Sequence, residues 1–145
     1  INKSILKKLF SSNIDSSLIL NIPKQLRHQE FYFIGIESKK DGYLTLIQIY
    51  ENGETALLFS NKKANNNIRL EYPNRNEYDG LEAYLNESQT KAKDLTIALI
   101  CKEKKDFSYF DNISVYKEKY AKVYGKVFDM MSGCNVSSEI VEIKR

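Results

Sequence analysis

Apolar residues recur along this chain mostly in the alternating or continuous runs that are typical of β-strands. The clearest run is Gly42 to Phe59, in which two stretches rich in Ile, Leu, Thr and aromatic residues flank the dipeptide Asn52-Gly53. Asn-Gly readily adopts the positive φ angles of tight turns, so this segment predicts an antiparallel hairpin. By the same criteria, further strands are predicted over residues 18–22, 31–37, 68–72, 95–101 and 138–143.

Two of these strands, Phe31 to Glu37 and Leu95 to Cys101, are apolar on both faces. Such strands must be covered on both sides, so we place them inside a sheet. Because only short polar turns separate them, the strands around Phe31, Tyr43 and Thr55 are predicted to form a consecutive antiparallel meander. Residues 60–67 are polar and predict a loop, and residues 74–94 predict a long irregular excursion.

Helical spacing is found mainly near the C-terminus. It predicts a helix from Ile113 to Met131, with Asp111 or Asn112 as the N-cap and Gly133 just past the end. The apolar residues spaced by three and four in this stretch are Ile113, Tyr116, Tyr120, Val123, Val127 and Met130. A shorter amphipathic run, residues 4–10, predicts one or two helical turns.

The predicted fold class is therefore α+β, mainly β, in a single domain over residues 1–145. It is an antiparallel, β-sandwich-like module with one long C-terminal helix packed on it. The length of 145 residues is enough for one hydrophobic core. The net charge of +3 is too small to indicate a nucleic-acid partner. No apolar run approaches the roughly 20 residues that span a bilayer, and the chain begins at Ile1 without a signal-peptide pattern, as a mature product or an excised domain would.

The sequence contains no catalytic motif. His28 is the single histidine and lies in a polar segment, so we interpret it as a solvated turn residue, with no second histidine to complete a metal site. Glycine-rich phosphate loops, the GxSxG nucleophile motif and the HExxH zinc motif are all absent. We therefore predict no enzyme, no cofactor and no metal site.

The two cysteines, Cys101 and Cys134, are too far apart in sequence to form a CxxC motif. We favour two unpaired thiols, with Cys101 buried in a strand. The alternative is a disulfide in an oxidising compartment, which requires the two Cα atoms to lie within about 7 Å of each other.

The polar section over residues 61–84 is the candidate site for a protein partner. It contains three tyrosines and two arginines, the residue types that carry most binding energy at interfaces, and long loops often bear binding residues. The candidate partner-binding residues are Arg69, Tyr72, Arg75, Tyr78 and Tyr84. The alternative is that the tyrosines pack this loop onto the sheet.

Four short runs in the first two thirds of the chain carry a resemblance to a known family. These runs are Asp41 to Leu46, Asn52 to Glu54, Leu57 to Asn61 and Asn67 to Leu70. In order and spacing they resemble domain-of-unknown-function family 4384, an uncharacterised β-rich domain of bacterial envelope and surface proteins. That family has a Gly-Tyr-Leu strand, an acidic-Gly turn, a Leu-Phe-Pro-Asn strand end and an Asn-Arg element. Ser60 stands where the family usually has proline.

The resemblance covers about residues 16–105, which leaves the predicted helix and last strand, residues 111–145, outside it. It implies an extracytoplasmic, β-sandwich-like module with no known enzymatic activity and no catalytic residue. We therefore expect a non-enzymatic protein-binding or assembly module of a bacterial cell-envelope or surface protein, located in the periplasm or at the cell surface. The alternative is a small cytoplasmic inhibitor such as an immunity protein, which the size and the lack of catalytic residues also fit.

Overall fold

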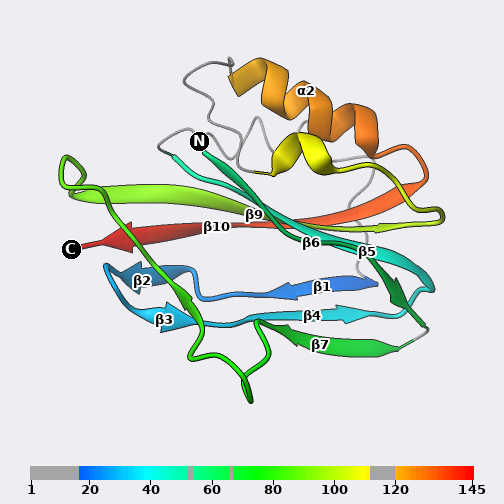
Figure 1. Cartoon of the computed structure of the whole chain (residues 1–145), viewed down its shortest axis with the longest axis horizontal. Coiled ribbons are helices and arrows are strands. Elements are labelled where there is room, and N and C mark those ends of the chain that lie inside the picture. Colours follow the sequence, from blue (N-terminus) through cyan, green and yellow to red (C-terminus); the bar gives the residue numbers. More distant parts are fainter. Residues whose placement is uncertain (1–16, 52–53, 66, 112–119) are drawn as a thin grey trace.

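A computed structural model shows a protein built in three layers. It describes residues 17–51, 54–65, 67–111 and 120–145, with the backbone alone described for residues 120–124. A five-stranded sheet forms the middle layer, a short helix and a 3-10 turn cover one of its faces, and a three-stranded sheet lies against the other (Figure 1). The middle sheet is therefore buried on both sides.

The middle sheet is organised around its central strand, β9 (Lys91–Cys101). Its strand order is β2 (Gln25–Arg27), β10 (Cys134–Lys144), β9, β5 (Gly42–Ile49) and β6 (Thr55–Ala64). All neighbours are antiparallel except β2 and β10, which are parallel. Successive residues of β9 point to opposite faces, so Leu95, Ile97 and Leu99 pack under the helix while Ala98 and Ile100 pack against the smaller sheet.

The smaller sheet has the order β1 (Leu18–Asn21), β4 (Ile34–Ser38) and β7 (Ile68–Tyr72), all antiparallel. Its inner face contributes Leu18, Leu20, Ile34 and Ile36 to the core between the two sheets. Beside it, β3 (Phe31–Tyr32) pairs with β8 (Leu81–Glu82). Gly80 precedes β8 at φ +126°, and a Cβ there would lie 2.8 Å from the carbonyl oxygen of Tyr32, so a side chain would separate β3 from β8.

The predicted hairpin is confirmed, because β5 and β6 are antiparallel neighbours. Asn52 and Gly53, which were expected to form its turn, lie outside the described residues, as does the short helix expected over residues 4–10. The strand expected over residues 95–101 is also confirmed at the centre of the sheet. Expected strands 18–22, 68–72 and 138–143 correspond to β1, β7 and the second half of β10.

The α+β class with one long C-terminal helix is wrong, and the fold is mainly β. The described helices are the 3-10 turn η1 (Ser108–Phe110) and α2 (Tyr120–Met130), which has eleven residues. Residues 112–119 of the predicted helix lie outside the described residues. Apolar spacing indicates which face of a helix is buried but does not fix its length, and α2 contains valine, tyrosine and glycine, which have low helix propensity. No described helix is long and apolar enough to cross a bilayer.

The consecutive meander is also wrong, because β4 does not pair with β5. The predicted strand over residues 31–37 is divided into β3 and β4, and β4 lies between β1 and β7 in the smaller sheet. The link between β4 and β5 crosses from one sheet to the other. It contains a turn in which the backbone N–H of Lys40 donates to Oγ of Ser38. Alternation of apolar residues defines the faces of a strand, but it does not identify the neighbouring strand.

Several strands lie where the sequence predicted loops. They include β2, β8, the first residues of β9 and β10, and the second half of β6, where residues 60–64 had been assigned to a loop. Strand β6 continues past Asn61 through a bulge, where the register against β5 shifts and Asn61 adopts φ +56°. The side chain of Asn61 bonds both the N–H and the carbonyl of Lys105. These polar segments form strands through pairing with distant segments, which local sequence does not reveal.

Cys101 and Cys134 form a disulfide, so the favoured assignment of two unpaired thiols is wrong. The two residues are directly opposite each other at the ends of β9 and β10. Both are buried in the core beneath the helix. Their proximity follows from the register of β9 against β10, which the spacing of two cysteines in sequence cannot supply.

Candidate functional site

The five predicted partner-binding residues lie in three different places. Arg69 and Arg75 line a broad groove on the outer face of the smaller sheet. Tyr72 and Tyr78 line a second groove between β6 and β7. Tyr84 lies apart from both, at a cavity beside the ends of β5 and β9. The four residues from Arg69 to Tyr78 therefore lie in or just after β7 but line two different grooves, and Tyr84 lies apart from both.

The outer groove has a volume of about 1020 Å³ and crosses β4 and β7. Aromatic side chains lie along it, with Phe31 54% exposed to solvent. The guanidinium of Arg75 stacks on the ring of Phe33, 4.0 Å from its centroid. Flat arginine and phenylalanine surfaces of this kind are common at the centres of protein interfaces.

Both arginines of the outer groove are held in position by carboxylates. Nε and Nη2 of Arg75 donate to the two oxygens of Glu71 at 2.8 and 2.9 Å, and Arg69 pairs with Glu37 across the strands. The hydrogen bond from Arg75 lowers the pKa of Glu71, so this carboxyl is ionised at neutral pH. Exposed ion pairs contribute little to stability, so their consequence here is to fix the orientation of the two guanidinium groups.

The second groove, of about 520 Å³, lies between the edge strands β6 and β7. Tyr72 packs its ring against Phe59, with 5.6 Å between ring centroids, and is half-buried. Tyr78 is 60% exposed. The alternative interpretation, in which a tyrosine packs the loop onto the sheet, therefore fits Tyr72, whereas Tyr78 presents most of its ring to solvent.

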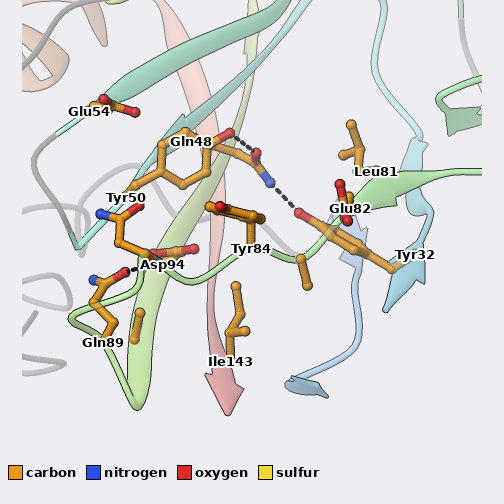
Figure 2. Close-up of a pocket in the computed structure, with 13 residues that line it drawn as sticks. Tyr32, Gln48, Tyr50, Glu54, Leu81, Glu82, Tyr84, Gln89, Asp94 and Ile143 are labelled. Atoms are coloured by element: carbon orange, nitrogen blue, oxygen red, sulfur yellow. Dashed lines mark hydrogen bonds between the residues drawn. The ribbon is translucent and has the colours of Figure 1, made fainter. Parts of the chain in front are cut away.

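Tyr84 borders a more enclosed cavity of about 180 Å³ (Figure 2). A chain of hydrogen bonds forms its inner wall: Tyr50 Oη donates to Gln48 Oε1 at 2.6 Å, and Gln48 Nε2 donates to Tyr32 Oη at 2.9 Å. The same amide also reaches Oγ1 of Thr96 at 3.3 Å. Burial raises the pKa of both Tyr32 and Tyr50, so these hydroxyls keep their protons and the wall is fixed and neutral.

Asp94 also lines this cavity and is only 8% exposed. Its Oδ1 accepts a hydrogen bond from the backbone N–H of Glu51 at 3.0 Å. Burial raises the pKa of Asp94 to about 6, and the neighbouring Glu51 carboxylate acts in the same direction, although the backbone hydrogen bond partly opposes the rise. At neutral pH, the protein therefore retains a buried carboxylate at a cost in stability.

We predict that Asp94→Asn stabilises the protein at pH 8 by about 3 kcal/mol, because each pKa unit corresponds to about 1.4 kcal/mol. Folding raises the pKa of Asp94 from 3.8 to about 6, so its contribution favours folding fully below pH 3.8 and is lost as the pH rises through 6. The stability difference between Asp94→Asn and the wild type should therefore increase, in favour of the variant, as the pH rises across this interval. Urea unfolding at pH 4.5, 6 and 8 measures the difference.

Asp106→Asn is the control for this prediction. Hydrogen bonds from Ser108 lower the pKa of Asp106, which is exposed, so its replacement should give no stabilisation at pH 8. A stability difference between Asp94→Asn and wild type that does not change with pH would contradict the prediction.

The sequence contained a signal for the cavity residues that the prediction did not use. Gln48, Asp94 and Thr96 are polar positions within or beside the most apolar strands, and all three are buried. A polar residue in such a run needs a partner or a function, so it marks a position to examine. His28 was interpreted as a solvated turn residue, but its Nδ1 accepts the backbone N–H of Leu85 at 2.9 Å and its ring packs on Tyr84.

Comparison with known proteins gives no family assignment. No protein-family model, curated protein or solved structure matches the chain. Within the described part of the chain, no three His, Cys, Asp or Glu residues are grouped so that they could hold a metal ion. The functional argument therefore depends on features of the structure itself, namely the grooves, the cavity and the disulfide.

Proposed function

We propose that this chain is a non-enzymatic protein-binding or assembly module of a bacterial cell-envelope or surface protein, and that it binds its partner through the outer groove. The observation that carries the proposal is the combination of exposed aromatic and oriented arginine side chains on the outer face of the smaller sheet. Phe31, Phe33, Arg69 and Arg75 all line this groove. Such residues give binding energy when a partner covers them.

The outer groove suits a protein partner for two further reasons. It is broad and open, so it accommodates a surface or an extended segment more readily than a small molecule, which favours an enclosed pocket. In addition, Arg75 already rests on Phe33 and is held by Glu71, so little conformational entropy is lost when a partner orders it.

The location outside the cytoplasm is supported by the disulfide. Disulfides persist in oxidising compartments and are rare in the cytosol. The bond between Cys101 and Cys134 therefore favours a periplasmic or cell-surface module over a cytoplasmic inhibitor.

The test compares partner recovery by the wild type and a Phe31→Ser, Arg75→Ala double variant. Both proteins are immobilised and exposed to cell-envelope extract of the encoding bacterium, and bound proteins are quantified by mass spectrometry. We expect at least one protein to be recovered about tenfold less by the double variant, because two interface anchors are removed. Equal recovery by the two proteins would overturn the proposal.

Phe128→Ser is the matched control. Phe128 is 51% exposed, much like Phe31, but it belongs to α2 on the opposite side of the middle sheet (Figure 1). The Phe128→Ser variant should recover the partner as fully as the wild type. The melting temperatures of all three proteins must agree, which is expected because the altered side chains are exposed. A partner recovered from cytoplasmic extract alone would favour the inhibitor instead.

A further inference from the structure

The cavity beside Tyr84 has the size and the enclosure of a binding site for a small chemical group. Its volume of about 180 Å³ exceeds the space needed for one water several times over. For comparison, a protein cavity of about 150 Å³ holds a benzene molecule. It opens between the ends of β5 and β9 and the segment that follows β8 (Figure 2). The cavity and the outer groove share Tyr32 in their linings, but the groove residues Phe31, Phe33, Arg69 and Arg75 do not line the cavity.

The charge around the cavity has a single sign. Three carboxylates line it, those of Glu54, Glu82 and Asp94, and none of its described lining residues is lysine, arginine or histidine. Arg145 lies at the same end of the protein, but its guanidinium donates to the backbone carbonyls of Asn86 and Gln89 and is not part of the lining. A cationic group would therefore enter a favourable electrostatic field.

Asp94 supplies the hydrogen-bond acceptor that such a group requires. It is more than nine-tenths buried, and only its Oδ1 is bonded to another described residue, the N–H of Glu51. Its Oδ2 receives no hydrogen bond from any described residue. Retaining this buried carboxylate costs stability, and residues kept at such a cost are common at functional sites.

Aromatic rings complete the cavity lining. Tyr50 and Tyr84 line the cavity together with Asp94, and Ile143 adds an aliphatic side chain to the lining (Figure 2). The face of a tyrosine ring attracts a cation, and the alkyl chain attached to that cation can pack against the ring and the isoleucine. The remaining polar wall consists of Gln48 and its tyrosine partners, which are hydrogen-bonded to one another.

We propose that this cavity binds a primary alkylammonium group, with Asp94 accepting its N–H bonds and the rings of Tyr50 and Tyr84 contacting its cationic and alkyl parts. The group belongs either to a free small amine or to a lysine side chain of another protein. This inference is independent of the proposed function, because it concerns a different surface.

The test is a titration of the full chain, followed by ¹⁵N NMR, with n-butylammonium chloride and with the neutral analogue n-butanol, at ionic strength matched with sodium chloride. We expect saturable shifts in the backbone signals of residues 48–51 and 82–94 for the amine, and a response at least about tenfold weaker for the alcohol. A parallel titration with Nα-acetyl-lysine amide distinguishes the sources. If Nα-acetyl-lysine amide binds more tightly than n-butylammonium, the ligand is assigned to a lysine side chain of another protein. If it binds equally well or more weakly, the ligand is assigned to a free amine.

Asp94→Asn removes the charge while keeping the shape and the hydrogen bond to Glu51, so it should weaken amine binding about tenfold or more. The variant is expected to be at least as stable as the wild type at neutral pH, so loss of binding cannot reflect unfolding. Tyr84→Ser should also weaken binding, whereas Tyr78→Ser, which alters an equally exposed ring outside the cavity, should leave it unchanged. Equal responses to amine and alcohol, no saturable response to the amine, or an unchanged titration in Asp94→Asn would overturn the proposal.

Discussion

Replacing Val127 with aspartate is expected to unfold the protein. Val127 is 1% exposed and lies on the face of α2 that packs on the middle sheet, in one core with Ile97 and Phe110. An unpaired carboxylate buried there must either remain charged or take up a proton, and both cost several kcal/mol. Because domains of this size are stable by only about 5 to 15 kcal/mol, we expect a loss of at least about 4 kcal/mol in urea unfolding.

The neighbouring Phe128→Asp variant provides the control for this prediction. Phe128 is 51% exposed, so a carboxylate at that position stays in water. The two variants introduce the same charge one residue apart and differ only in the face of α2 that carries it. A normal melting temperature for Val127→Asp would show that the helix does not pack on the sheet.

The strands and their buried faces were the most predictable part of the fold. Leu95 to Cys101 is apolar at every position except Thr96, and this strand is central in the sheet with both faces covered. The alternation of Leu18 and Leu20 likewise predicts which side of β1 is buried. These features are local, because a single strand with two apolar faces already requires two layers around it.

Strand order was not predictable in the same way. Strands β4 and β5 are consecutive and joined by a short polar turn, yet they belong to different sheets. A turn of this kind fits a hairpin and a crossing between sheets equally well, and the choice depends on packing among residues far apart in sequence. The polar strand β2 shows this dependence on distant residues, because its partner, β10, lies more than a hundred residues later in the sequence.

The candidate sites show the same division between local and distant information. Arginine and tyrosine composition directed attention to residues 69–78, and these side chains do gather around β7. Composition could not show that Tyr84 faces a different cavity, or that Asp94 lies beside it, because that arrangement depends on β9 packing under the segment after β8. A buried polar residue in an apolar strand was the available signal.

The disulfide connects the fold to the question of where the protein functions. It links the end of β9 to the start of β10. The two cysteines are 33 positions apart in sequence, and the segment between them includes η1 and α2. In the unfolded chain, the bond would close this long loop and reduce its conformational entropy. On the chain-entropy model, a loop of about 33 residues corresponds to about 3 to 4 kcal/mol of stability.

The Cys101→Ala, Cys134→Ala double variant is therefore expected to lose about 3 to 4 kcal/mol of stability in urea unfolding, as is wild-type protein unfolded in the presence of a reductant. Agreement between these two losses assigns the effect to the bond, because alanine removes the sulfur atoms from the core whereas reduction keeps them there. Thiol titration of the wild type, performed under denaturing conditions without reductant, should find no free thiol. Two free thiols in protein purified from an oxidising compartment would contradict the disulfide, and they would remove the strongest structural support for a periplasmic or cell-surface location.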